Sequence, residues 1–132
     1  MPGDRRELAA IFAGGFIGAV ARALVGDALP HDDPATWPWA TFAVNVAGAF
    51  ILGAFATRLQ ERLPLSAYRR PFIGTGVCGA LTTFSTMQLE LLRMLDGGHV
   101  AVALGYAAAS LAGGFAAVAV ASNLVRRARV AA

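Results

Sequence analysis

Residues 74–87 read GTGVCGALTTFSTM and lie inside an apolar run from Pro71 to Leu92. This stretch holds three glycines and five hydroxyl side chains. Glycine weakens a helix, and Ser and Thr side chains compete for backbone hydrogen bonds. The pattern therefore predicts a helix that breaks at membrane depth. The freed backbone groups are tolerated there only where protein or a water-lined cavity satisfies them, and such places hold ions in transporters.

The composition predicts an integral membrane protein. Of 132 residues, 57% are hydrophobic and 14% are charged, whereas soluble proteins have about 25% charged residues. Each of four apolar segments is long enough to cross a bilayer, which takes about 20 helical residues. We therefore expect one all-α membrane domain, with four transmembrane helices and the break in the third. The predicted spans are residues 8–28, 38–59, 69–94 and 100–125.

The positive charges are all arginines. Their distribution between the segments that connect the spans predicts a multi-pass protein of the cell membrane with both termini on the cytoplasmic side. Of the 11 basic residues, Arg22 and Arg93 lie at span edges on the opposite side. A nucleic-acid-binding tail would be a block of basic residues without this alternation, so we expect no nucleic-acid partner. The nine on the predicted cytoplasmic side are Arg5, Arg6, Arg58, Arg62, Arg69, Arg70, Arg126, Arg127 and Arg129.

The polar residues inside the predicted spans are mostly neutral hydrogen-bond donors. Hydroxyls and amides suit a small, hard anion, because they replace its hydration without binding so tightly that the ion cannot leave. The ring of Phe84 adds a positively polarised edge that an anion can approach. The polar residues are Thr41, Asn45, Thr82, Thr83, Ser85, Thr86, Glu90, Tyr106 and Ser110.

Two polar residues of the predicted spans, Asn45 and Arg22, can each be assigned one of two roles. Asn45 must find a partner in hydrocarbon, and it serves either as a contact between helices or as part of an ion pathway. Arg22 lies near the outer end of the first span. Its side chain either snorkels to the headgroups or caps the mouth of a pore.

Three motifs carry a resemblance that covers nearly the whole chain. They are G-x-x-G-A-x-x-R at residues 15–22, T-x-x-V-N-x-x-G at residues 41–48 and G-A-L-T-T-F-S-T at residues 79–86. In their order and in the number of spans, they closely resemble the Fluc (CrcB) family of bacterial fluoride channels. The T-T-F-S-T core after a glycine is the most specific of these signals.

The resemblance implies a dual-pore fluoride channel built from two four-helix subunits packed antiparallel. It also implies a structural sodium ion, not transported, on backbone carbonyls at the positions that match Gly79 and Thr82. Independently of the resemblance, the position of Arg22 near the end of the first span makes it the candidate for a pore mouth. Met87 stands where the family has a second Phe, and Gly114 stands where it has a further hydroxyl. The predicted anion pathway is Asn45, Phe84, Thr86, Met87, Glu90, Tyr106 and Ser110.

The expected function is passive export of fluoride from the cytoplasm, which needs no catalysis and no nucleotide. The arginine bias should fix one orientation, so an antiparallel pair forms with an oppositely oriented paralogue, the other possibility being a homodimer. The alternative function is a small multidrug-type antiporter. That class needs an acid in the first span, where Asp27 lies only at the edge. A passive scaffold subunit is a third possibility.

Overall fold

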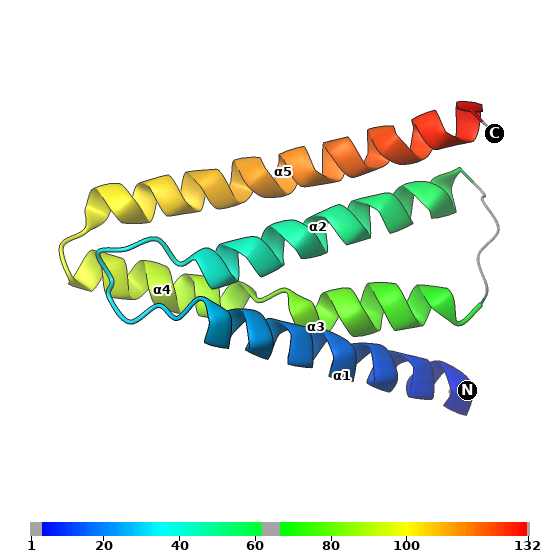
Figure 1. Ribbon diagram of the computed structural model, residues 1–132, viewed down its shortest axis with the longest axis horizontal. Coiled ribbons are helices and arrows are strands. Elements are labelled where there is room, and N and C mark those ends of the chain that lie inside the picture. Colours follow the sequence, from blue (N-terminus) through cyan, green and yellow to red (C-terminus); the bar gives the residue numbers. More distant parts are fainter. Residues whose placement is uncertain (1–3, 62–66, 132) are drawn as a thin grey trace.

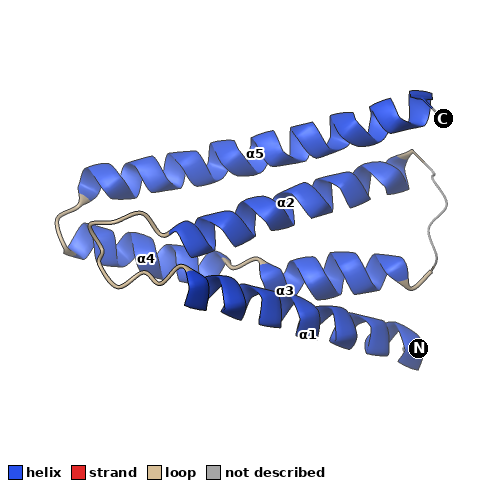
Figure 2. Cartoon of the chain, viewed as in Figure 1, coloured by secondary structure: helices blue, strands red, loops and turns tan. Residues whose placement is uncertain are grey.

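The computed structural model describes residues 4–61 and 67–131. Helices and the loops between them make up the described part of the chain (Figure 2). The long helices lie along the long axis of the molecule, and both termini are at the same end (Figure 1). In chain order the elements are α1 (Arg5–Ala28), α2 (Trp39–Gln60), the π-helix η1 (Arg70–Cys78), α3 (Gly79–Leu81), α4 (Phe84–Asp96) and α5 (Val100–Ala131).

Within the described residues, three helices are long and apolar enough to cross a membrane without interruption, namely α1, α2 and α5. The sequence predicted four spans. The third, residues 69–94, is divided among η1, α3 and α4, and the longest of these pieces has 13 residues. The chain is thus a multi-pass helical membrane protein whose third segment is not one continuous helix.

Glycines bring α1 against the third segment. Gly14 and Gly18 are buried on α1. A Cβ at either position would collide with the backbone oxygen of Phe72 or Val77, and one on Gly76 would lie 2.7 Å from the carbonyl oxygen of Ile11. Backbones that approach this closely exclude any side chain larger than hydrogen at the contact.

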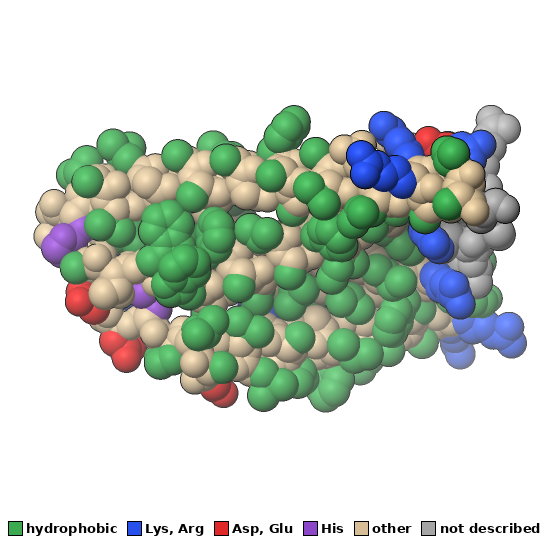
Figure 3. All heavy atoms as spheres, turned by 45° about the horizontal axis from the view of Figure 1, so that its top comes forward, with side chains coloured by type: hydrophobic (Ala, Val, Ile, Leu, Met, Phe, Trp, Pro, Cys, Tyr) green, Lys and Arg blue, Asp and Glu red, His purple; other side chains and the backbone are tan. Residues whose placement is uncertain are grey.

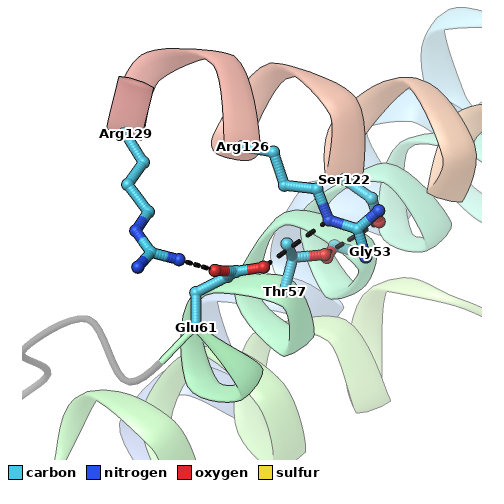
Figure 4. A network of polar contacts seen from close by, with 6 residues as sticks. All are labelled: Gly53, Thr57, Glu61, Ser122, Arg126 and Arg129. Atoms are coloured by element: carbon cyan, nitrogen blue, oxygen red, sulfur yellow. Dashed lines mark hydrogen bonds and ion pairs between the residues drawn. The ribbon is translucent and has the colours of Figure 1, made fainter. Parts of the chain in front are cut away.

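Helix α2 packs against α5. Gly53 fits against the backbone of Val118, where a Cβ would lie 2.9 Å from its Cα. One turn later, the hydroxyl of Thr57 is hydrogen-bonded to the Gly53 carbonyl and to the Ser122 hydroxyl, each at 2.8 Å. Beyond it, the Glu61 carboxylate contacts two arginines of α5, Arg126 and Arg129 (Figure 4).

Charge separates along the molecule. Figure 3 shows arginines gathered at the end where the termini lie, and histidines with most of the visible acidic groups at the other end. Of the nine arginines predicted on one side, Arg62 lies outside the described residues. Which end faces the cytoplasm stays a prediction.

Large apolar side chains cover the flanks between these charged ends (Figure 3). Phe12, Leu111 and Phe115 are 77%, 74% and 79% exposed. Exposing so much apolar surface to water would be unfavourable, so these flanks are suited to contact with lipid chains.

Candidate functional site

Two residues of extended backbone, Thr82 and Thr83, separate α3 from α4. Their φ/ψ angles are −81°/152° and −147°/115°. Thr82 closes α3, because its N–H and its hydroxyl both donate to the Cys78 carbonyl, at 3.1 and 2.9 Å. Thr83 begins α4, because its hydroxyl oxygen accepts the Thr86 N–H at 3.2 Å. Each hydroxyl therefore takes up a backbone group at a helix end.

The sequence analysis attributed the break to glycines and hydroxyl side chains together, and the glycines remain helical. Gly74 and Gly76 lie within η1, and Gly79 begins α3. The close contact with α1 holds Gly76 in place, since the Ile11 carbonyl lies against it. The change of direction occurs instead at the threonines, where side chains replace the missing helical partners.

Asn45 of α2 pairs with the backbone of Thr83. Its Nδ2 donates to the Thr83 carbonyl at 3.0 Å, and its Oδ1 accepts the Thr83 N–H at 2.8 Å. In a continuous α-helix that N–H would donate to the Gly79 carbonyl, four residues earlier. Of the two interpretations of Asn45, the contact between helices is therefore present, and it diverts a donor away from Gly79.

A cavity of about 400 Å³ opens beside this pair, and its lining includes Asn45, Gly48, Gly79, Thr82 and Phe84. Gly79 is exposed, and a Cβ there would meet nothing within 4 Å. The Phe84 side chain is 74% exposed. Among the described residues the ring is thus not enclosed, so its predicted role toward an anion requires a surface from outside this subunit.

A second cavity, of about 300 Å³, lies on the other side of Thr83. Arg22 of α1 lines it together with Thr41 of α2 and Thr86 of α4, and Thr83 borders both cavities. Arg22 is exposed there. The residue predicted to lie at a pore mouth and a threonine of the predicted pathway therefore share one polar pocket next to the interruption.

Glu90 is buried between two hydroxyl groups. Its Oε1 accepts from Thr41 Oγ1 at 2.7 Å, and its Oε2 accepts from Tyr106 OH at 2.8 Å. Glu90 is 8% exposed and Tyr106 is 0% exposed. A carboxylate away from water needs such donors, because an unpaired buried charge is strongly unfavourable. Both oxygens are therefore held by α2 and α5.

The remaining predicted residues lie around this cluster. Met87 packs against the apolar group of Met94, Ala103 and Tyr106. Ser110 lies one turn beyond Tyr106, and its Oγ is buried with no hydrogen-bond partner among the described residues. A buried hydroxyl without a partner is uncommon, and the hydrogen-bonding capacity of this oxygen is unused in the described residues. The structure does not test which of these side chains an ion touches.

Sequence reasoning missed two contacts. The hydrogen bond from Thr41 to Glu90 was not foreseen. Thr41 lies one helical turn before Asn45, and this spacing, which puts both on one face of α2, was the available signal. The Glu61 cluster at the basic end was also missed (Figure 4). The regular four-residue spacing of Gly53, Thr57 and Glu61 places all three on one face of the helix.

Comparison with known proteins gives a consistent picture. The family model described as CrcB-like protein, Camphor Resistance (CrcB), matches residues 9–122. A relative from Mycolicibacterium paratuberculosis, named Fluoride-specific ion channel FluC 1, is 60% identical over 127 residues, covering 96% of each chain. The protein of the same name from Mycobacterium tuberculosis is 59% identical over 127 residues with the same coverage.

More distant relatives share the description. Nocardia farcinica has a relative named Fluoride-specific ion channel FluC 2, which is 40% identical over 125 residues, covering 95% of this chain and 89% of its own. Streptomyces avermitilis has relatives named FluC 2 and FluC 3. One organism therefore contains more than one protein of this kind.

Proposed function

This chain belongs to the CrcB family, and from that membership we propose that it forms a fluoride channel that exports the ion passively from the cytoplasm. The names of relatives with 59–60% identity supply the identity of the ion. The observation that carries the proposal for the route is the extended backbone at Thr82 and Thr83, which borders two cavities. Neutral hydroxyl and amide donors there suit a small anion.

The membrane potential drives the export. An inside-negative potential moves each anion outward with about 2.3 kcal/mol per charge per 100 mV. Fluoride enters cells as neutral HF from acid surroundings and is trapped inside as the anion. No chemical step is required of the protein, so the proposed activity is transport without catalysis.

Along the proposed pathway, Arg22 attracts the anion at the pocket that it shares with Thr86. Asn45 and Phe84 border the neighbouring cavity, and the Tyr106 and Ser110 hydroxyls continue the polar track along α5. Glu90 orients Tyr106 by accepting a hydrogen bond from its hydroxyl. Met87 contributes an apolar wall, because a thioether has no positively polarised ring edge to offer an anion.

A structural sodium ion is proposed on the carbonyls of Gly79 and Thr82. The fit rests on two observations: the Thr83 N–H that would bond to Gly79 in a continuous helix donates to Asn45, and both residues line one open cavity. Carbonyl oxygens are the ligands that a hard cation prefers. When bound, the ion would supply a fixed positive charge next to the anion route.

Assembly with a second subunit is part of the proposal. Phe84, Ser85 and Thr86 are all exposed in the single chain, so a partner surface is needed to enclose them. Two subunits packed antiparallel, through the face that holds Gly79 and Phe84, would supply it. The partner is either a second copy or an oppositely oriented paralogue, and the numbered relatives in one organism support the second possibility.

The test is efflux from liposomes that contain the protein with its partner subunit. We expect rapid release of fluoride and retention of chloride under the same potential, measured with ion-selective electrodes. Equal release of both ions would contradict selectivity. Replacing sodium on both sides by a large organic cation should lower fluoride release, and unchanged release would remove Gly79 and Thr82 from the proposed sodium site.

A growth assay separates the channel from the antiporter alternative. Cells that lack the gene should become sensitive to fluoride and should keep their resistance to lipophilic cations. Sensitivity to the cations alone would favour the antiporter, and unchanged growth in both media would favour a scaffold role.

A further inference from the structure

A groove on the flank of the molecule is separate from the cavities described above. It lies between α2 and η1 at the basic end and has a volume of about 290 Å³. Two arginines border it, Arg58 of α2 and Arg69 just before η1. The other residues that line it are apolar, and they are Phe50, Ile51, Ala54, Phe55 and Ile73.

The two arginines lie at the same end of the groove. Arg58 follows the apolar residues along α2, whereas Arg69 precedes Ile73 in the third segment. Because the chain reverses direction between these segments (Figure 1), both guanidinium groups lie toward the end where α2 finishes. The groove is therefore apolar along its length and cationic at one end.

Neither arginine is neutralised by a carboxylate in residues 4–61 and 67–131. Glu61, the nearest acid along α2, contacts Arg126 and Arg129 (Figure 4). Asp4 accepts from the Arg6 N–H at 2.9 Å and from Tyr68 OH at 3.3 Å. Glu61 and Asp4 thus have other partners, and Glu7 in the first turn of α1 forms no ion pair with either arginine in the described residues, which leaves Arg58 and Arg69 available to an anion.

The arginines lie at the depth of lipid headgroups. With a rise of about 1.5 Å per residue, α2 spans about 33 Å, close to the thickness of the hydrocarbon core. Arg58 is two residues from its last residue, Gln60. A phosphate at this level would be followed by an acyl chain running toward the bilayer centre, in the direction that the apolar residues take.

A second subunit would leave the groove open. Given about 100° per residue, the mean direction of the α2 residues that line the groove lies about 140° from that of the α2 residues that line the cavity of the proposed subunit interface, which include Asn45 and Gly48. A partner seated on the Gly79 and Phe84 face therefore contacts the opposite flank, and the groove remains in contact with lipid.

We propose that this groove binds an anionic phospholipid. The Arg58 and Arg69 guanidinium groups hold its phosphate, and the apolar wall holds one acyl chain. Guanidinium groups bind phosphate through paired hydrogen bonds, and basic pockets between helices at the headgroup level select anionic lipids. The site is independent of the fluoride route, because none of its residues lines the cavities beside Thr83.

The test measures lipid binding to the purified full-length protein, with its partner subunit, by native mass spectrometry. Phosphatidylglycerol and phosphatidylcholine with the same acyl chains are titrated separately. We expect the R58Q/R69Q variant to bind phosphatidylglycerol about tenfold more weakly. R127Q serves as the matched control, because Arg127 is an exposed arginine at the same end that does not line the groove. It should bind within about twofold of the unmodified protein.

Three outcomes would overturn the proposal. Equal loss in R127Q would mean that only the general surface charge matters. Equal binding of phosphatidylcholine would mean that the arginines do not select the headgroup. Displacement of the lipid by millimolar inorganic phosphate would mean that the arginines hold a free anion.

A second measurement locates the lipid directly. Phosphatidylglycerol with a photoreactive group midway along one acyl chain is crosslinked to the unmodified protein, and the labelled peptides are mapped. We expect labels within residues 50–55 or at Ile73, and labels confined to other segments would exclude this groove. This crosslinking measurement does not depend on fluoride flux. A negative result would therefore reject the lipid site without rejecting the proposed channel function.

Discussion

Asn45 supplies one amide that pairs with both backbone groups of Thr83. This pairing explains how extended backbone persists between two helices in an apolar environment. A carboxamide carries its donor and its acceptor on two separate atoms, so it can replace both helical partners that Thr83 lacks. The same residue borders the larger cavity, and a structural role does not conflict with one in transport.

We expect Asn45→Leu to destabilise the protein by about 1–3 kcal/mol for each Thr83 backbone group left without a partner. Leucine fills a similar volume but offers neither donor nor acceptor. The melting temperature in detergent should fall, and fluoride efflux should fall with it. Asn45→Asp, which keeps an acceptor for the Thr83 N–H, should lose less stability than Asn45→Leu.

Asn123→Leu is the matched control, because Asn123 is an exposed asparagine on α5. It should unfold close to the temperature of the unmodified protein. If Asn45→Leu and Asn123→Leu unfold together, the pairing with Thr83 contributes nothing measurable to the fold.

At the scale of the helices, only some of the glycines of α1 face the third segment and allow the close contact. A methyl group at Gly14 or Gly18 would meet backbone atoms of that segment, whereas one at Gly15 would have nothing within 4 Å. Three glycines close together in one helix thus differ in what they do. The distinction follows from their direction around α1, because residues four apart share a face and the intervening one does not.

Gly18→Ala should destabilise the protein by about 1–3 kcal/mol, because its methyl group collides with the Val77 carbonyl and neither backbone can yield freely. Gly15→Ala should be neutral or slightly stabilising, because alanine favours helix and the position is open. Thermal unfolding of the two variants in the same detergent measures the difference. Equal melting temperatures would show that α1 does not rest on the third segment as described.

Across the whole molecule, the charge distribution bears on assembly. Nine arginines lie on the predicted cytoplasmic side of the sequence, and two lie on the other. A bias of this size fixes one orientation during insertion. An antiparallel pair of identical chains would require half of them to insert against it. The bias therefore favours a partner of opposite orientation.

We expect vesicles that contain this chain alone to release little fluoride, and vesicles that also contain an oppositely oriented paralogue to release it rapidly. The reason is that only the mixed pair places both subunits in their preferred orientation. Efflux under a fixed potassium diffusion potential measures the difference. Comparable efflux per protein from this chain alone would refute the heterodimer and favour a homodimer.

The sequence by itself determined the membrane class, the family and the separation of charge, because these depend on composition, on local motifs and on residues near helix ends. It placed the change of direction within residues 74–87, where glycines and hydroxyl side chains both lie, but it did not separate the threonines, where the change occurs, from the glycines, which stay helical.

Only the tertiary structure decided where that change occurs and what each polar group bonds to. Thr83 is extended because Asn45, 38 residues away, takes its N–H and its carbonyl. Glu90 is buried because hydroxyls from α2 and α5 meet its two oxygens. Such pairings join segments far apart in the chain, and a pattern of neighbouring residues carries no information about which distant donor will arrive.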